Sequence, residues 1–318
     1  MRKKKPHKII HVAIGLVIAF LAAFTLQRCA PGSGDNRNDG GRIDIVTTTG
    51  MIGDAVENIA GENANVVALM GPGVDPHLYK ATHGDLEKLT NADIIFYNGL
   101  HLEGKMGEVF EKLGRTRPVI AVAAGIPDSL LRAVPGFQGT HDPHIWFDVS
   151  LWKHAVSAIS VFLQEYDSAN AGTYRQNSAR YLSRLDSLHE SIEKYVRVIP
   201  EQQRVLITAH DAFGYFGDAY GIEVRGLQGI STVSEFGLRD VTNLVDFIIS
   251  RKIKAIFVET SVSKKSINAV VEGCHQKKWN VRIGGSLYSD AMGPDGTPEG
   301  NYIGMVNANV RSIVEALK

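Results

Sequence analysis

The segment from Tyr174 to Pro200 reads YRQNSARYLSRLDSLHESIEKYVRVIP and is the most periodic stretch of the chain. Its apolar residues recur at steps of three, four or seven, and charged residues occupy the positions between them. The pattern predicts one amphipathic helix of roughly 30 residues, about 45 Å long at the α-helical rise. We place this helix at 166–199, just before Pro200. The alternative is an ordinary packed helix within one larger domain.

Short β-branched runs alternate with helical patterns on the N-terminal side of this segment. We expect strands at 43–48, 65–70, 93–97 and 118–122, with helices at 51–60, 82–89 and 106–113 between them. Strands that alternate with helices indicate βαβ units and a parallel sheet.

The C-terminal side repeats the theme, with expected strands at 204–208, 255–258 and 280–283 and helices ending near 220, at 241–250 and at 303–317. A helix as long as 166–199 between two such units connects them rather than belonging to either sheet. We therefore predict an α/β fold with two lobes, each a mainly parallel sheet flanked by helices, joined by one long helix. The N-terminal lobe takes 42–165 and the C-terminal lobe takes 200–318.

The first 29 residues are typical of an export signal. MRKKKPHK is basic, the 18 residues IIHVAIGLVIAFLAAFTL are largely apolar, and Cys29 follows. A cysteine directly after an export signal resembles the lipid-attachment cysteine of bacterial lipoproteins, although Arg28 stands where a small residue is usual. An uncleaved single-helix membrane anchor is the alternative. The Gly- and Asn-rich residues 30–41 indicate a flexible tether.

Composition excludes one class of partner. The chain has 34 basic and 34 acidic residues, and the export signal holds six of the basic residues and no acidic one. The remaining chain is therefore mildly acidic, with 28 basic against 34 acidic residues and no basic run. Nucleic acid is excluded as the partner because phosphate neutralisation needs clustered Lys and Arg. With Cys29 used for lipid, Cys274 has no intramolecular partner, and we predict a buried thiol.

Three of the eleven histidines lie at the ends of expected strands or in the loops after them. His77 follows the turn GVDP, His144 lies in GTHDPHIWFD, and His210 closes the strand at 204–208. Asp290, in GGSLYSD, follows another strand-like stretch. Ligand sites in open α/β sheets form at the carboxyl ends of strands. Three imidazoles and a carboxylate suit Zn²⁺ or Mn²⁺, yet without a local HxxxH-type signature the spacing alone does not establish a site.

Several motifs resemble those of the TroA-type metal-binding proteins of zinc/manganese ABC importers. They are DPH at 75–77, HDPHIW at 141–146, TAHDAFGYF at 208–216, GLQGIST at 226–232 and GGSLYSDAMG at 284–293. The similarity covers 42–318. It implies a metal ion held between two α/β lobes joined by one long helix, with His77 and His144 from the N-terminal lobe and His210 and Asp290 from the C-terminal lobe.

The resemblance also implies a location and partners. The protein would act in the periplasm or at the cell surface, anchored to the membrane by lipid on Cys29, and would deliver Zn²⁺ or Mn²⁺ to an ABC importer permease. Members that favour zinc often carry a loop rich in His, Asp and Glu. The segment Pro135–Asp142 has one His and one Asp, which disfavours a dedicated zinc scavenger.

The other histidines have ordinary interpretations. His7 and His11 belong to the export signal, and His83, His154 and His189 lie in helical patterns. His101 also follows a strand, but the resemblance gives it no ligand role, and His141 is a candidate transient ligand. Metal-bound imidazoles are usually oriented by a carboxylate that accepts the other ring N–H. The candidates for this role are Asp142, Asp148, Asp211 and Glu259, and the sequence does not favour one over another.

Two other functions compete with a metal carrier. In a metallohydrolase Asp290 would not be a ligand, and three histidines would leave a position for an activated water. An adhesin would use the same scaffold for binding a surface. A serine hydrolase is discarded because the chain has no GxSxG motif.

Overall fold

The computed structural model describes residues 41–134 and 139–318, and Arg42–Lys318 forms one compact unit. The predictions of an export signal at 1–29, of lipid attachment at Cys29 and of a tether up to residue 40 lie outside the described residues. Among the helices in the described part of the chain, none is both long and apolar enough to cross a membrane.

The N-terminal lobe is built on a four-stranded parallel sheet. Its order is β2-β1-β3-β4, so the first strand lies inside the sheet, where Ile45 pairs with both Val66 and Ile94. The strands are β1 (Ile43–Thr49), β2 (Ala64–Met70), β3 (Ile94–Tyr97) and β4 (Val119–Ala121). The helices are α2 (Gly50–Ala60), α3 (His83–Asn91), α4 (Gly107–Leu113) and α5 (Val149–Tyr166). The expected strands and helices are confirmed to within about two residues, whereas α5 is an addition.

The C-terminal lobe has two parallel strand pairs, β5 (Val205–His210) with β6 (Glu223–Gln228), and β7 (Ala255–Glu259) with β8 (Arg282–Leu287). β5 and β7 lie in contact. The helices are α7 (Gly214–Tyr220), α8 (Leu238–Ser250), α9 (Lys265–Gln276) and α10 (Tyr302–Leu317). Neither β6 nor α9 was among the expected elements.

The last strand begins and ends later than the expected 280–283. It runs through Gly284 and Gly285, beyond the expected end of the strand. A Cβ atom on Gly284 would lie 2.7 Å from the Cβ atom of Ala316 in α10. Glycine is therefore needed here because the strand and the terminal helix approach closely.

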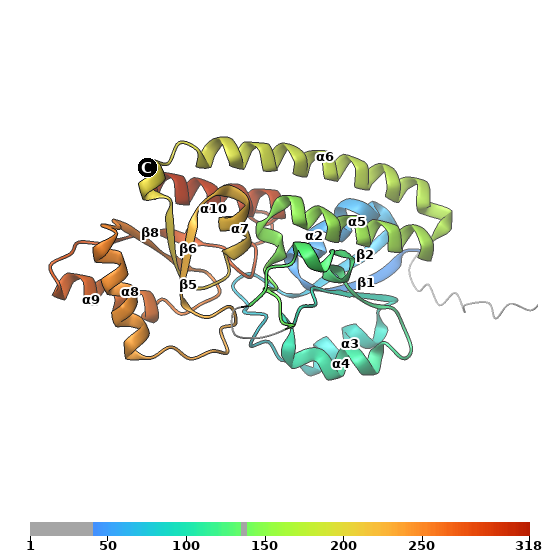
Figure 1. Cartoon of the computed structure of the whole chain (residues 1–318). Coiled ribbons are helices and arrows are strands. Elements are labelled where there is room, and N and C mark those ends of the chain that lie inside the picture. Colours follow the sequence, from blue (N-terminus) through green and yellow to red (C-terminus); the bar gives the residue numbers. More distant parts are fainter. Residues whose placement is uncertain (1–40, 135–138) are drawn as a thin grey trace, which may run out of the picture. The chain divides into compact units, whose positions relative to one another are not determined.

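The long connecting helix is α6 (Ala171–Val196), which spans both lobes beside α5 and α10 (Figure 1). Its 26 residues make about 39 Å of helix. The expected start at 166 is wrong, because α5 runs to Tyr166 and a 3₁₀ turn at Ser168–Asn170 separates the two helices. The break is at Asp167, whose backbone leaves helical geometry and whose carboxylate accepts the Tyr174 hydroxyl at 2.6 Å.

The buried apolar residues form one shared core and two separate ones. The shared cluster takes side chains from α2, α5, α6 and α10 and from strands of both lobes, with Leu185 of α6 fully buried. A second cluster lies under α8 and α9 and contains the buried Cys274, as predicted, and a third lies under α3 and α4. The lobes are thus joined by apolar packing on the α6 side and have separate cores on the other.

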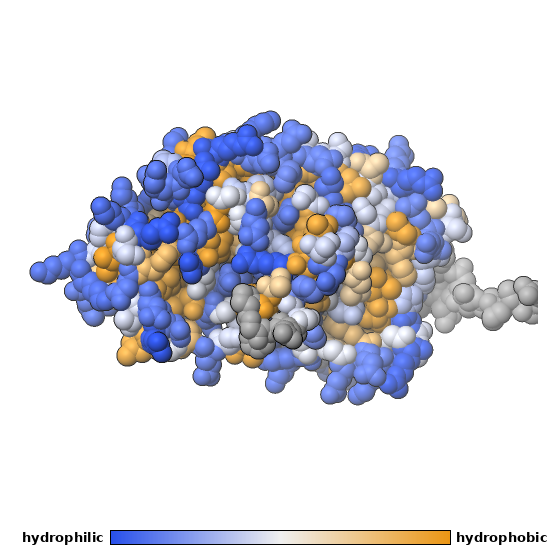
Figure 2. Space-filling model, viewed as in Figure 1, coloured by the Kyte–Doolittle hydropathy of each residue, from blue (hydrophilic) through white to orange (hydrophobic). Residues whose placement is uncertain are grey.

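The solvent-facing surface of this unit is mostly polar. Figure 2 shows hydrophilic residues over most of the viewed face, with hydrophobic residues scattered between them. Along α6, Tyr181 and Leu185 are buried whereas Tyr195 is 58% exposed. The amphipathic pattern therefore predicted the buried face of the helix correctly at Tyr181 and Leu185. Tyr195, which belongs to the same pattern, is exposed instead.

Candidate metal site

The four residues expected to bind metal lie at a strand end or in loops and come together between the lobes. His77 follows β2, His210 is the last residue of β5, and Asp290 is in the loop after β8. His144 precedes the 3₁₀ helix Ile145–Phe147. One potential ligand atom from each residue lies within 4.8 Å of the others, and all four side chains are buried, with exposed fractions from 0% to 4%.

The ligand atoms face one another. The Nε2 atoms of His77 and His144 are 3.3 Å apart. Asp290 Oδ1 lies 3.4 Å from His144 Nε2, and Asp290 Oδ2 lies 3.4 Å from His210 Nε2. His210 Nε2 and Asp290 Oδ1 are buried without a hydrogen-bond partner among the described residues. Such orphaned atoms are costly, and a cation between them would satisfy both.

Two of the four candidate carboxylates hold the imidazole rings. Asp142 Oδ1 accepts from His144 Nδ1 at 2.7 Å, and the two oxygens of Glu259 accept from His210 Nδ1 at 2.5 Å and from its backbone N–H at 2.9 Å. Each ring thereby has its Nε2 directed at the site, the arrangement typical of metal-bound histidine. Asp148 instead caps α5 by accepting the N–H of Ser150, and Asp211 makes no described hydrogen bond to either ring.

Asp290 and His77 are positioned by short polar side chains. Ser261 Oγ donates to Asp290 Oδ2 at 3.0 Å, and His77 N–H donates to Asp75 Oδ1 at 2.9 Å. Sequence reasoning missed Ser261. The available signal was position alone, since Ser261 lies in the loop directly after β7, two residues beyond Glu259. β7 and the loop after it therefore supply none of the four candidate ligands but contact both candidates of the C-terminal lobe.

The electrostatics of the site favour a bound cation. Burial opposes charge on His144, but the carboxylates of Asp142 and Asp290 outweigh it and raise the pKa of His144 to about 9. The pKa of His210 is raised in the same way by Asp290 and Glu259. Burial also opposes charge on Asp290, yet both imidazoles keep the pKa of this carboxyl well below its usual value. Burial lowers the pKa of His77 to about 3.

Comparison with known proteins identifies the family. The model of the periplasmic zinc-uptake complex component A, or ZnuA, family matches residues 45–316. The chain belongs to this family. It is 50% identical over 306 residues to the manganese-binding lipoprotein MntA of Bacillus subtilis, covering 96% of this chain and 99% of MntA. It is 47% identical to the zinc-binding protein TroA of Treponema pallidum, covering 96% of each.

A solved structure of a relative has the same architecture. The periplasmic zinc-binding protein TroA of Treponema pallidum superposes with a TM-score of 0.85 at 49% identity, covering 87% of this chain and 99% of that one. The two-lobed α/β fold with a long connecting helix, predicted from the sequence, is thus confirmed. Family membership places the chain among transport solute-binding proteins.

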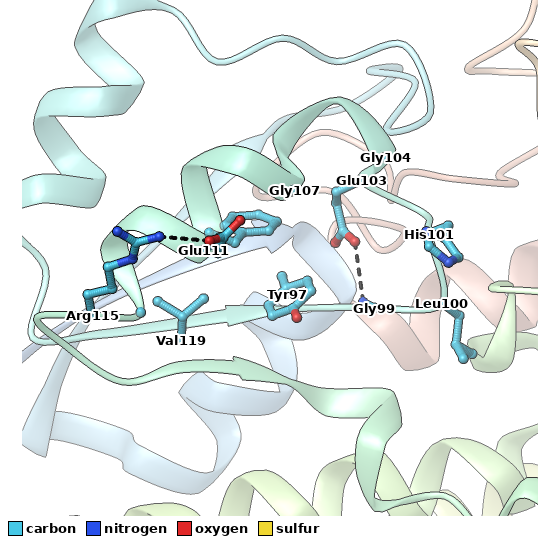
Figure 3. Close-up of a pocket in the computed structure, with 12 residues that line it drawn as sticks. Tyr97, Gly99, Leu100, His101, Glu103, Gly104, Gly107, Glu111, Arg115 and Val119 are labelled. Atoms are coloured by element: carbon cyan, nitrogen blue, oxygen red, sulfur yellow. Dashed lines mark hydrogen bonds and ion pairs between the residues drawn. The ribbon is translucent and has the colours of Figure 1, made fainter.

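His101 and His141 lie outside the cluster of four candidate ligands. His101 follows β3 on a tight loop where Leu100 and His101 both have positive φ, and the loop is held by Glu103, which accepts the Asn98 N–H at 2.8 Å. His101 is one of the residues that line a cavity of about 620 Å³. Figure 3 shows it on the opposite side of this cavity from Arg115, which pairs with Glu111. His141 Nε2 lies 3.4 Å from the exposed carboxylate of Asp128.

The helical histidines keep ordinary roles. His83 begins α3, and His154 is an exposed residue of α5. His189 Nδ1 lies 3.0 Å from the hydroxyl of Tyr220. None of these three rings belongs to the cluster of four potential ligands.

Proposed function

We propose that this protein binds Zn²⁺ or Mn²⁺ outside the cytoplasmic membrane and delivers the ion to the permease of an ABC importer. Its cargo is held by His77, His144, His210 and Asp290. The observation that carries this proposal is that four buried side chains from both lobes place their potential ligand atoms within 4.8 Å of one another. Nitrogen and oxygen donors of this kind suit both ions. The relatives described above are named for manganese and for zinc binding.

Membrane attachment belongs to the same proposal. Lipid on Cys29 anchors the protein, and residues 30–41 act as the tether. The two lobes comprise residues 42–165 and 200–318. The connecting helix lies within 166–199. Support comes from the relatives, several of which are named as lipoproteins. Radiolabelled palmitate incorporated into the wild-type chain but not into Cys29→Ser would support this anchor.

The protein is a carrier and not an enzyme. A metallohydrolase needs an open position for water, whereas here the Asp290 carboxylate lies 3.4 Å from two of the imidazoles. We therefore expect metal-loaded protein to hydrolyse no ester, phosphate or amide probe. The hydrolase would be favoured if the wild-type chain turned over such a probe and Asp290→Ala lost this turnover while still binding metal. Surface binding that survives His77→Ala and His210→Ala would favour the adhesin.

The direct test combines binding with uptake. Purified full chain should bind one Zn²⁺ or Mn²⁺ in a chelator competition, and His210→Ala should lose this affinity by at least about a hundredfold. Cells that lack the gene should lose uptake of the physiological ion, and the wild-type gene should restore uptake where His210→Ala does not. His154→Ala, at an exposed position of α5, is the matched control and should behave as wild type. A wild-type chain that binds neither ion contradicts the proposal.

A further inference from the structure

One side-chain hydrogen bond crosses from lobe to lobe directly beside a proposed metal ligand. Thr232 Oγ1, in the loop after β6, donates to Asp75 Oδ2 at 2.6 Å. The other oxygen of the same carboxylate accepts the backbone N–H of His77 at 2.9 Å. Asp75 therefore ties the loop of an N-terminal-lobe ligand to a loop of the C-terminal lobe that supplies no ligand.

Other hydrogen bonds that cross between the lobes involve Trp146 and Tyr215, which lie in the shared core. Trp146 Nε1 donates to the carbonyl of Ser289 at 3.0 Å, and Tyr215 Oη donates to the carbonyl of Asp142 at 2.9 Å. Trp146 and Tyr215 both belong to the apolar cluster that joins the lobes. These two bonds therefore lie where the lobes are already held together by packing.

The bond between Thr232 and Asp75 lies on the other side of the site. Val74, the neighbour of Asp75, packs against the separate apolar cluster under α3 and α4, and Asp75 and Thr232 are both partly exposed. The neighbours of Thr232, Ser231 and Val233, line a cavity of about 660 Å³ that is also lined by His77. Separation of the lobes about their shared core would open this side most and would break this bond first.

We propose that Thr232 is a positioning residue that latches the two lobes closed over bound metal and slows its release. The proposal rests on the proposed function, because it concerns the escape of the same ion. The latch acts through Asp75 and the His77 loop, without contact between Thr232 and the ion. A bond that forms only in the closed state slows dissociation, whereas association with the open state does not depend on it.

The test measures release and capture separately. Zn²⁺-loaded full chain is mixed with excess chromogenic chelator in a stopped-flow instrument to obtain the dissociation rate, and metal-free chain is mixed with Zn²⁺ to obtain the association rate. We expect Thr232→Val to release Zn²⁺ about tenfold faster, a factor that corresponds to about 1.4 kcal/mol, with the association rate unchanged. Thr232→Ser keeps the hydroxyl and should restore slow release.

Two controls separate a latch from general damage. Thr242→Val removes an equivalent hydroxyl whose bond, to the carbonyl of Leu238 at 2.9 Å, stays within α8, and it should leave release unchanged. Thr232→Val should add no further acceleration to Asp75→Ala, which removes the acceptor, because the two residues form one bond.

The outcomes are distinct. Wild-type release rates in Thr232→Val, or equal acceleration in Thr232→Ser or Thr242→Val, would overturn the latch while leaving the metal site intact. A wild-type chain that captures no Zn²⁺ would instead overturn the proposed function on which the latch rests.

Discussion

Glu259 holds His210 by both its ring and its backbone, with one carboxylate oxygen 2.5 Å from Nδ1 and the other 2.9 Å from the backbone nitrogen. The two residues are buried at the ends of the neighbouring strands β7 and β5. This double contact fixes the ring direction and leaves Nε2 facing the site. Glu259, which is not one of the four proposed ligands, therefore sets the direction in which His210 faces the proposed site.

Glu259→Gln should weaken metal binding. The amide can still accept one of the two bonds, but it removes the negative charge that supports the ring. Loss of such an orienting partner typically costs 10- to 100-fold in metal affinity, and we expect Kd for Zn²⁺ to rise by about that factor in a chelator competition. Asp148→Asn is the control, because Asp148 caps α5 instead and its replacement should change Kd less than about twofold. An equal loss in both variants would contradict the role of Glu259.

Removal of metal should lower thermal stability. A ligand that binds only the folded state stabilises it by about 4 kcal/mol at a thousandfold excess over Kd. At about 2–4 °C per kcal/mol, the melting temperature should fall by on the order of 10 °C when a strong chelator is added. Asp290→Ala should melt at the same temperature with and without chelator. A chelator-independent melting temperature in the wild-type chain would contradict the site.

Affinity should rise with pH. Only the unprotonated Nε2 can ligate, and the raised pKa values of His144, to about 9, and of His210 mean that both rings carry a proton in the metal-free protein near neutrality. His77, with its pKa lowered to about 3, is already neutral. Binding below pH 9 must displace these protons, so the apparent affinity should increase up to about a hundredfold per pH unit between pH 6 and 8.

Proton release gives an independent measure of the same linkage. Addition of Zn²⁺ to the metal-free chain in weak buffer at pH 7 should release about two protons per ion. The His77→Ala variant should release the same number if it still binds, because its missing ring carried no proton. A pH-independent affinity would contradict the predicted protonation of His144 and His210.

Leu185→Ala should destabilise both lobes together. Leu185 is fully buried on α6 within the core shared by the lobes, and deletion of a buried leucine side chain typically costs about 2–5 kcal/mol. Urea unfolding of metal-free protein should shift by that amount and remain a single transition. Tyr195→Ala on the same helix, where the side chain is 58% exposed, should change stability by less than about 0.5 kcal/mol. Two separate transitions would show that the core does not couple the lobes.

The sequence by itself determined the local features of this fold. The steps of three, four and seven along α6 and the alternation of strands with helices follow from contacts within each element and from the burial of one face. The misplaced start of the helix has a different origin. Periodicity continues through both α5 and α6, and the break depends on the contact of Asp167 with Tyr174. The expected end of the last strand at 283 was too early, and the close approach of Gly284 to Ala316 of α10 is a contact that only the fold provides.

The tertiary structure decided how the site is assembled. The sequence placed His77, His144, His210 and Asp290 at strand ends or in the loops beside them, and resemblance to a family grouped them. Only folding shows that their ligand atoms converge and that Asp142 and Glu259, but not Asp148, contact the rings. The physical reason is range: a hydrogen bond forms only when atoms approach to about 3 Å with the right direction. Residues as far apart in the chain as His210 and Glu259 meet that condition only after β5 and β7 have packed together.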